Sequence, residues 1–240
     1  MRGILAAVLV PVVVVFLIGP YTFLPSLLEY AVARDVQARL GAERQPDVRL
    51  ESDPALEMLA GAFSDGSIVL KKTELGGVRA ERVRIDLDPF DINVWASMKS
   101  GHVVDREPLS GEIQLEVPET EVSRLVKARS DVPVTGVDVK EDRMVVKSEA
   151  SAFGAQFPVS VKGDLGVSES SLVFEPQSLE AAGIPVPQEL ADKLLAGADF
   201  EYSLDRLPYQ TRITGVQTEG EQLVLSGRVP SIPLGVYPGG

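Results

Sequence analysis

Hydrophobic and polar residues alternate over several long stretches of this chain. Residues 78–87, VRAERVRIDL, place apolar side chains at every second position, with one change of phase between Ala80 and Val83. Residues 112–117 and 157–167 show the same period of two. Strict alternation is typical of antiparallel strands that bury one face and expose the other to water, and a change of phase indicates a β-bulge. Further strands are expected over residues 47–52, 68–75 and 200–204.

A helical period precedes these strands. Apolar residues recur at every fourth position from Leu28 to Leu40, Ser26 precedes them as a cap, and Gly41 follows as a stop. A short second helix is expected over residues 54–61, ahead of a turn at residues 64–67.

The short helix has a clear start signal in the sequence. Asp53 is a suitable N-cap, and Pro54 suits the first helical position because its fixed backbone angle already matches a helix.

Two later helices are expected to start at Pro118 and Pro187, the second ending before Gly197. Their inward-facing residues are expected to be Val122, Leu125 and Val126 in the first, and Leu190, Leu194 and Leu195 in the second.

The order of these elements predicts an α+β fold, a strongly curved antiparallel sheet wrapped around one or more amphipathic helices, preceded by an N-terminal transmembrane helix. We expect residues 1–25 to form a membrane anchor, or an uncleaved signal, and residues 26–240 to form a single domain. Residues 135–147 align without gaps to residues 214–226, and both read as β-hairpins. Either the two segments share hairpin chemistry alone, or they reflect a duplication or two equivalent rims of one sheet.

The N-terminus carries an unbroken apolar run. Residues 4–18 are apolar, and residues 4–24 would give roughly 30 Å of helix, enough to cross a bilayer. No small-x-small cleavage pattern follows closely, so an uncleaved anchor in the cytoplasmic membrane is favoured over a cleaved signal and secretion. Arg2 predicts a single-pass protein whose N-terminus is cytoplasmic and whose domain lies outside.

Composition limits the partners. The net charge of −12 disfavours nucleic acid and anionic bilayer surfaces, so an anionic lipid would be held mainly through its acyl chains. The chain has no cysteine, which excludes disulfides, thiolate metal sites and thiol nucleophiles. The sequence does not specify an oligomeric state.

Catalytic and metal-binding patterns are weak, and we expect neither enzyme activity nor a cofactor or metal. His102, the single histidine, sits in a polar turn and is interpreted as a solvated loop residue. Asp86, Asp88 and Asp91 lie close enough in sequence to suggest calcium, but without the glycine and distal glutamate of an EF-hand. A hydrolase that uses a carboxylate pair is the least favoured alternative, because no pair stands out among the 35 acidic residues.

Two aromatic residues, Phe90 and Trp95, follow a strand in a turn-like segment. We interpret both as core residues. The alternatives are the mouth of a cavity or the bilayer interface, where tryptophan is enriched.

The stretch LGAERQPDVRLESDPALEMLAGAFSDGSIVLKK followed by VRAERVRIDL, and the later LPYQTRITGVQTEGEQLVLSGR, resemble the LmeA-type phospholipid-binding family of bacterial envelope proteins. The resemblance covers residues 27–234. This chain has Ala55 where the family usually has phenylalanine, and Gln210 where a glycine is usual. The resemblance implies an extracytoplasmic phospholipid-binding protein, linked to envelope lipoglycan assembly, with a tubular lipid-binding fold and an apolar groove.

For such a groove we predict a set of aliphatic and aromatic contacts to the lipid. An acyl chain gains about 0.8 kcal/mol per buried methylene, so two chains bind without a basic site. The predicted lipid-binding residues lie on the 54–63 segment and on the strand that follows: Leu56, Leu59, Phe63, Val83, Ile85 and Leu87. In the alternative interpretation these residues fill a solid core, and the protein is an anchored structural or interaction protein that works through its exposed hairpin tips.

Overall fold

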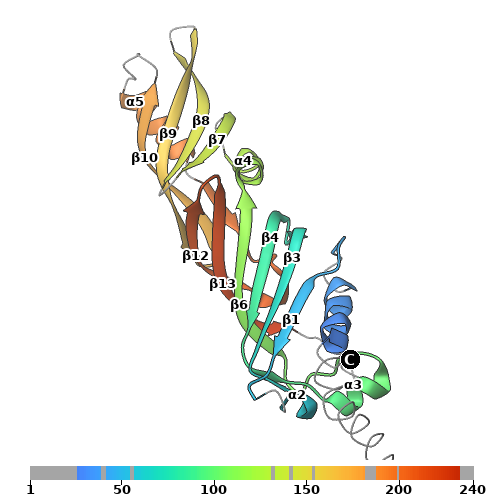
Figure 1. Cartoon of the computed structure of the whole chain (residues 1–240). Helices are drawn as coiled ribbons and strands as arrows, with labels where there is room; N and C mark the ends of the chain where they lie inside the picture. The colour runs from blue at the N-terminus through green and yellow to red at the C-terminus, as the bar shows by residue number, and fades with distance from the viewer. Residues whose placement is uncertain are drawn as a thin grey trace, which may run out of the picture. The chain divides into compact units, whose positions relative to one another are not determined.

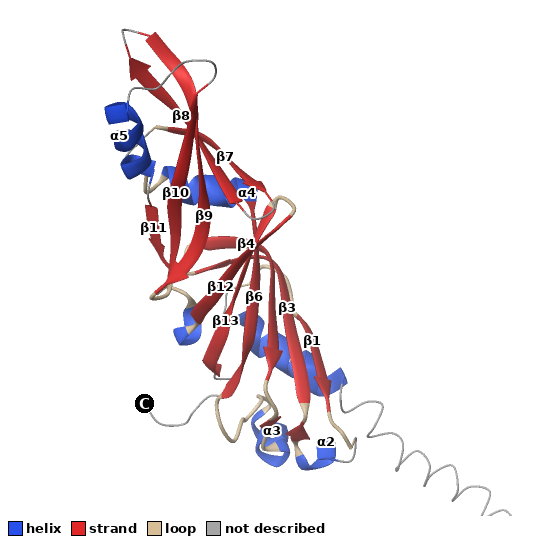
Figure 2. Ribbon diagram, turned by 90° about the vertical axis from the view of Figure 1, so that its left-hand side faces the viewer, coloured by secondary structure: helices blue, strands red, loops and turns tan. Residues whose placement is uncertain are grey.

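The computed structural model describes residues 26–38, 42–54, 57–130, 133–140, 143–152, 155–181, 188–198 and 200–232 (Figure 1). Strands dominate and helices are few, which confirms the predicted α+β class built on curled antiparallel sheet (Figure 2). The predicted anchor over residues 4–24 lies outside this part of the chain. Within the described residues, none of the helices is long and apolar enough to cross a membrane.

The strands form three sheets. The largest has the order β1 (Asp47–Glu51), β3 (Asp65–Leu75), β4 (Val78–Leu87), β6 (Leu109–Pro118), β13 (Gln222–Ile232) and β12 (Arg212–Glu219). The second has the order β11 (Phe200–Ser203), β10 (Ser171–Ala181), β9 (Ala155–Ser168), β8 (Arg143–Ala152) and β7 (Val134–Lys140). The third pairs β2 (Ala62–Phe63) with β5 (Phe90–Asp91).

The helices are short. Residues 26–38 are helical. They are followed along the chain by α2 (Glu57–Ala60), α3 (Val94–Ser100), α4 (Glu119–Lys127), α5 (Gln188–Ala198) and the 3-10 helix η1 (Pro208–Gln210).

Contacts between residues divide the described chain into two compact units, which are described separately below. The first contains the described residues up to Leu70, together with Arg84–Gly111 and those from Pro230 onward. The second contains Lys71–Val83 and Glu112–Val229. The expectation of a single domain over residues 26–240 stays a prediction.

In the first unit, helix 26–38 lies beside β1 (Figures 1 and 2). Leu28, Val32 and Val36 of the predicted apolar stripe are buried, as is Ala33, and Leu40 lies outside the described residues. The backbone N–H of Leu50 on β1 donates to Glu29 Oε1 of this helix at 3.1 Å. Because β1 is an edge strand, its outer N–H groups need such partners.

The change of phase predicted in β4 is present. Ala80 and Val83 are both buried, and the two residues between them are exposed. On β3, Lys71 and Lys72 are likewise both exposed, and Lys72 has a positive φ of 51°.

The internal repeat forms two equivalent hairpins in the second unit. Lys140 pairs with Arg143 at the tip of β7–β8, and Glu219 pairs with Gln222 at the tip of β12–β13. In both hairpins the register shifts between the residue that precedes the Thr-Gly pair and the glycine. The equivalent closing pairs and the equivalent bulge position mean that the aligned residues occupy the same places in the two hairpins.

Helix α4 follows the prediction closely. Pro118 is its N-cap residue, and Val122, Leu125 and Val126 are buried. Helix α5 runs through Gly197 to Ala198, so the predicted end before Gly197 was wrong. A glycine inside a helix costs only about 1 kcal/mol, which a packed helix tolerates.

The segment after β1 differs from its prediction. Helix α2 begins at Glu57, so Pro54 is not its first residue, and the Asp53–Pro54 bond is cis. Residues 64–67 do not form a separate turn, because Asp65, Gly66 and Ser67 pair with β1 as the start of β3. Pairing with a neighbouring strand satisfies the backbone of these residues better than a turn does.

Candidate functional site

Two short strands bring a pair of aromatic rings together in the first unit. Phe63 on β2 pairs with Phe90 on β5, and their ring centroids lie 5.0 Å apart with an interplanar angle of 15°. A Cβ at Gly66 would lie 3.0 Å from Leu87 Cδ1 and 3.2 Å from Leu50 Cδ2. The absence of a side chain at Gly66 therefore lets these aliphatic groups close around the stacked rings.

Helix α2 is joined to α3 by a close backbone contact. Gly61 follows α2 with a φ of +87°, and its carbonyl accepts a hydrogen bond from the N–H of Ile92 at 2.8 Å. A Cβ at Gly61 would lie 2.2 Å from the Ile92 carbonyl oxygen, which only glycine avoids. The two helices consequently lie side by side at one end of this unit (Figures 1 and 2).

Helix α3 was not predicted, although its signals are present. The Asn93 side chain accepts a hydrogen bond from the N–H of Ala96 at 2.9 Å, and Gly101 ends the helix with a φ of 72°. An asparagine before and a glycine after a seven-residue stretch are ordinary helix boundaries.

The expected core position of Trp95 was wrong, because its side chain is 73% exposed. Helix α3 instead turns Ser97 inward, where its hydroxyl donates to the Asn93 carbonyl at 2.8 Å and accepts from the Val104 N–H at 2.9 Å. Residues two positions apart in a helix are separated by about 200° around its axis. Because Ser97 faces inward, Trp95 therefore lies on the opposite, solvent-facing side. Phe90 is half-buried through its stacking on Phe63.

The predicted lipid-binding residues fall into four groups. Phe63, Ile85 and Leu87 are buried in the first unit, with 2 to 5% exposure, and Leu59 in the same unit is 44% exposed. Val83 is fully buried but belongs to the second unit. Leu56 lies outside the described residues. The structure thus brings Phe63 and Leu87 into one cluster and leaves Leu59 outside it.

Four large hydrophobic side chains are exposed among the described residues, and all belong to the first unit: Leu27 (65%), Tyr30 (58%), Leu59 (44%) and Trp95 (73%). The first two had a sequence signal, since they lie on the side of helix 26–38 opposite its buried stripe.

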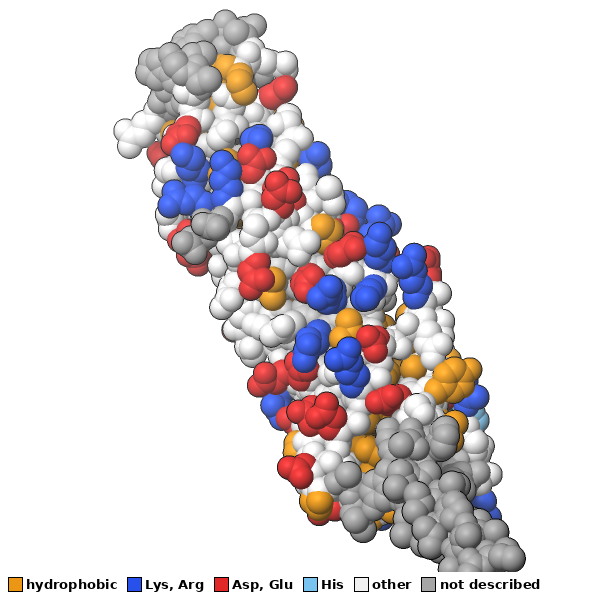
Figure 3. Space-filling model, in the orientation of Figure 1, with side chains coloured by type: hydrophobic (Ala, Val, Ile, Leu, Met, Phe, Trp, Pro, Cys, Tyr) orange, Lys and Arg blue, Asp and Glu red, His pale blue; other side chains and the backbone are white. Residues whose placement is uncertain are grey.

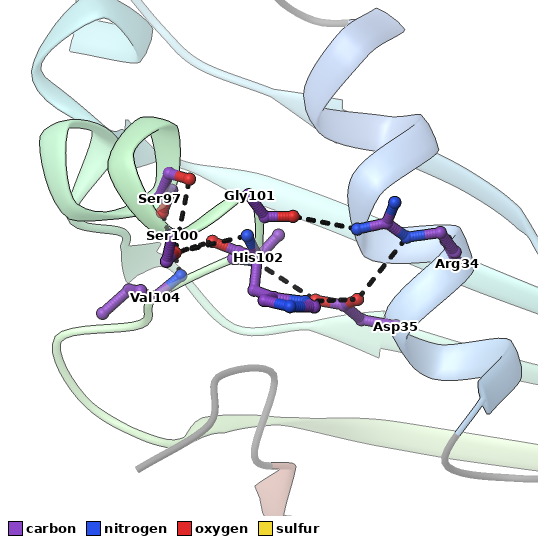
Figure 4. Close-up of polar contacts among 8 residues, drawn as sticks. Arg34, Asp35, Ser97, Ser100, Gly101, His102 and Val104 are labelled. Carbon is purple, nitrogen blue, oxygen red and sulfur yellow. Dashed lines mark hydrogen bonds and ion pairs between the residues drawn. The ribbon is translucent and has the colours of Figure 1, made fainter. Parts of the chain in front are cut away.

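A polar network ties helix 26–38 to the segment after α3 (Figure 4). Arg34 Nη2 donates to the Gly101 carbonyl at 2.9 Å, and the Val103 N–H donates to Asp35 Oδ2 at 3.3 Å. The His102 Nδ1 lies 3.6 Å from Asp35 Oδ1, and its side chain is 52% exposed. His102 is thus a solvated loop residue, as predicted.

The carboxylates that were considered for calcium have other partners. The single Nε–H of Arg84 is shared between the two carboxylate oxygens of Asp86, each at 2.9 Å, and this contact raises the pKa of Arg84 above its usual value. Asp88 accepts a hydrogen bond from the Ser110 hydroxyl. Among the described residues, no group of three or more acidic or histidine side chains is arranged to hold a metal ion.

In the second unit, one face of the five-stranded sheet is apolar. Met144 lies opposite Gly163, and Val146 lies opposite Val161, with all four buried. Phe174 stacks on Phe200 at a centroid distance of 5.8 Å. Helix α4 packs against β7 at one edge of this sheet, and α5 packs against β10 near the other.

Among the hollows beside this sheet, two are lined by residues of the hairpins. One, of about 380 Å³, is lined by the half-buried aliphatic residues Leu165 and Val216 together with Arg143, Gln217 and Thr218. The other, of about 570 Å³, lies between the two hairpin tips and the start of α4. It is lined by Glu119, Asp138, Val139, Lys140, Arg143, Gly220 and Glu221. The first hollow has two aliphatic residues in a mostly polar lining, and the second is lined mainly by polar and charged residues.

Comparison with protein families identifies a family that matches most of the chain. The family described as LmeA-like phospholipid-binding matches residues 20–228. Comparison with curated proteins and with solved structures gives no match.

Proposed function

The chain belongs to the LmeA-like phospholipid-binding family, and on this basis we propose that it is a membrane-tethered, extracytoplasmic protein that binds or transfers phospholipid in support of cell-envelope lipoglycan assembly. The observation that carries the proposal is the family match, because it extends over both structural units. Residues 4–24 serve as the tether, with the domain on the outer side of the cytoplasmic membrane.

Recognition relies on acyl chains rather than on headgroup charge. The net charge is −12, and most buried side chains of both units are aliphatic. Each methylene that leaves water contributes about 0.8 kcal/mol, so two acyl chains provide ample affinity without a cationic pocket.

Leu59 is the proposed entry point of the site, because it is the described residue of the predicted set that is open to a ligand. In the same unit, Phe63 stacks on Phe90, and Phe90 and Leu87 both lie next to Gly66. An acyl chain reaches them only when these side chains separate, as in a groove that opens on binding.

The protein acts as a binder rather than as an enzyme. In support, its single histidine is an exposed loop residue. The carboxylate of Asp86 forms an ion pair with Arg84, and that of Glu121 forms an ion pair with Arg124. An interaction protein that works through its hairpin tips is the second candidate, favoured by the polar hollow between those tips.

Extraction of the purified fragment 26–240 with organic solvent, followed by mass spectrometry, tests lipid binding. We expect phospholipid in near-stoichiometric amount, and uptake of a fluorescent phospholipid by the delipidated fragment. A fragment that carries no lipid and also takes none up would overturn the proposal. Resistance of the full chain to alkaline extraction from membranes tests the tether separately.

A further inference from the structure

The first unit has four exposed large hydrophobic side chains that are not part of its core. We call Leu27, Tyr30, Leu59 and Trp95 the interfacial patch. Trp95 and Leu27 are the most exposed of the four, at 73% and 65%. Large exposed apolar groups that gather on one part of a protein mark a contact surface more often than chance exposure does.

Local contacts place these residues near one another. Leu27, Tyr30 and Arg34 follow at spacings of three and four, so they share one face of helix 26–38. Arg34 on that face donates to the carbonyl of Gly101, the residue that ends α3. The face that carries Leu27 and Tyr30 therefore leads directly to the helix that carries Trp95.

Leu59 joins the same surface through the contact between α2 and α3. The Gly61 carbonyl binds the Ile92 N–H, and a Cβ at Gly61 would lie 3.0 Å from Val94 Cγ2 of α3. Figures 1 and 2 show that helix 26–38 begins at the end of the unit that carries α2 and α3. On the face drawn in Figure 3, hydrophobic side chains gather beside the histidine, whereas charged side chains are spread over the strands.

The position of the patch in the chain identifies what covers it. The apolar run over residues 4–24 ends two residues before Ser26, the first residue of helix 26–38. A chain anchored through that run holds the start of the helix within a few residues of the bilayer surface. The surface next to Ser26 then faces lipid headgroups.

We propose that the interfacial patch rests on the bilayer that anchors the chain, with Trp95 and Tyr30 at the level of the headgroups. This inference rests on the tether of the proposed function. Tryptophan and tyrosine favour that level because their rings are apolar at one end and polar at the other. Lys99 lies one helical turn after Trp95 on α3, so its amine points to the same side and reaches phosphate groups.

The patch inserts only to a shallow depth. Exposed carboxylates flank it, namely Glu57 on α2 and Asp91 before α3. Charged carboxylates do not enter the hydrocarbon, so the contact is limited to the rings and the leucine side chains. Docking at this depth points the α2–α3 end of the unit, with Leu59, toward the lipids that the protein is proposed to bind.

Trp95 provides its own probe, because it is the only tryptophan in the chain. The full chain is reconstituted into phosphatidylcholine vesicles, and its fluorescence is quenched either by lipids brominated near the headgroup end of the acyl chain or by aqueous iodide. We expect brominated lipid to quench Trp95 severalfold more than iodide does. Lipids brominated near the bilayer centre should quench less, because the contact is shallow.

A variant with the tryptophan elsewhere in the same unit gives the matched control. In the double variant W95F/Q45W the indole replaces an exposed side chain in the loop after helix 26–38, and this helix extends about 16 Å from Leu27 to its last described residue. There we expect the opposite pattern, with iodide as the stronger quencher. In addition, Leu27→Glu should reduce the lipid quenching of Trp95 without changing the thermal midpoint, since the Leu27 side chain is 65% exposed.

Two results would overturn the inference. Equal iodide quenching of Trp95 and of the control indole would place the patch in water. Shielding of Trp95 from both quenchers would show that protein, such as a second copy of the chain, covers the patch. Either result leaves phospholipid binding by the 26–240 fragment standing, so failure of the patch and failure of the proposed function are distinguishable.

Discussion

Arg124 holds the buried carboxylate of Glu121 at two points. Its Nε donates to Glu121 Oε2 at 2.7 Å, and its Nη2 donates to Oε1 at 2.5 Å. The N–H of Arg79 donates to the same carboxylate at 3.0 Å, and Arg124 Nη2 also binds the Gly77 carbonyl. Glu121 is 5% exposed, so this network fastens α4 to the β3–β4 turn within the second unit.

This network makes stability depend on pH. Burial raises the pKa of Glu121, but the hydrogen bonds from Arg124 and Arg79 and their charges outweigh burial, and the pKa is lowered from 4.5. A carboxyl with a lowered pKa in the folded state stabilises the protein above its unfolded pKa. That stability is lost as the pH falls through the folded pKa. We expect the free energy of unfolding to decrease below about pH 4.5, and Glu121→Gln to show a shallower decrease. Urea unfolding at a series of pH values measures the free energy of unfolding of the wild type and of the variant. The same pH dependence in both proteins would contradict the prediction.

A double-mutant cycle measures the Glu121–Arg124 pair itself. Glu121→Gln should cost about 1–3 kcal/mol of unfolding free energy, because a charge-assisted, buried hydrogen-bond network is weakened. Arg124→Gln should cost about as much, because the buried carboxylate loses its counter-ion. The coupling energy should be about 1–2 kcal/mol. The exposed Arg84–Asp86 pair is the control, with an expected coupling of about 0.5 kcal/mol or less. Equal coupling in both pairs would contradict the role of burial.

The backbone contact between α2 and α3 predicts a sharp difference between two glycines. Gly61→Ala should cost about 2–4 kcal/mol, because the new Cβ meets the Ile92 carbonyl and the backbone keeps a positive φ. Gly101→Ala should cost only about 1–2 kcal/mol, because its φ is also positive but nothing lies within 4 Å of the new Cβ. Chemical denaturation compares the two variants. If Gly101→Ala lowered the free energy of unfolding more than Gly61→Ala does, the close backbone contact between α2 and α3 would be contradicted.

Two stacked phenylalanine pairs, one in each unit, allow the lipid site to be located. Phe63→Leu and Phe174→Leu should each lower the free energy of unfolding by about 1–2 kcal/mol, because each ring is buried against a second ring. Only Phe63→Leu should also lower the amount of phospholipid bound per folded protein. Mass spectrometry of lipid extracts from matched folded samples measures this. A loss confined to Phe174→Leu would move the site to the sheet of the second unit.

Local patterns were sufficient for much of the fold. The bounds of β4, the buried stripe of helix 26–38 and the inward residues of α4 were predicted, because each depends on the period of side chains within a single element. The two hairpins were predicted for the same reason. The start of β3 was not, because residues 65–67 resemble a turn until β1 is available to pair with them.

The candidate site was less predictable, because it depends on neighbours far along the chain. Phe63 and Phe90 lie far apart in the sequence, and no local pattern predicts that their rings stack. Glu121 in the first turn of α4 is buried, and one of its hydrogen-bond donors is the backbone N–H of Arg79, 42 positions earlier.

The sequence by itself determined the strand and helix periods, the apolar N-terminal run, the charge balance and the family resemblance. Those properties are carried by residue types and short spacings. Only the tertiary structure decided that Trp95 and Leu59 are exposed and that the exposed large hydrophobic side chains among the described residues lie in one unit. Periodicity determines which side chains share a face, but what covers that face depends on residues that the chain brings in from elsewhere.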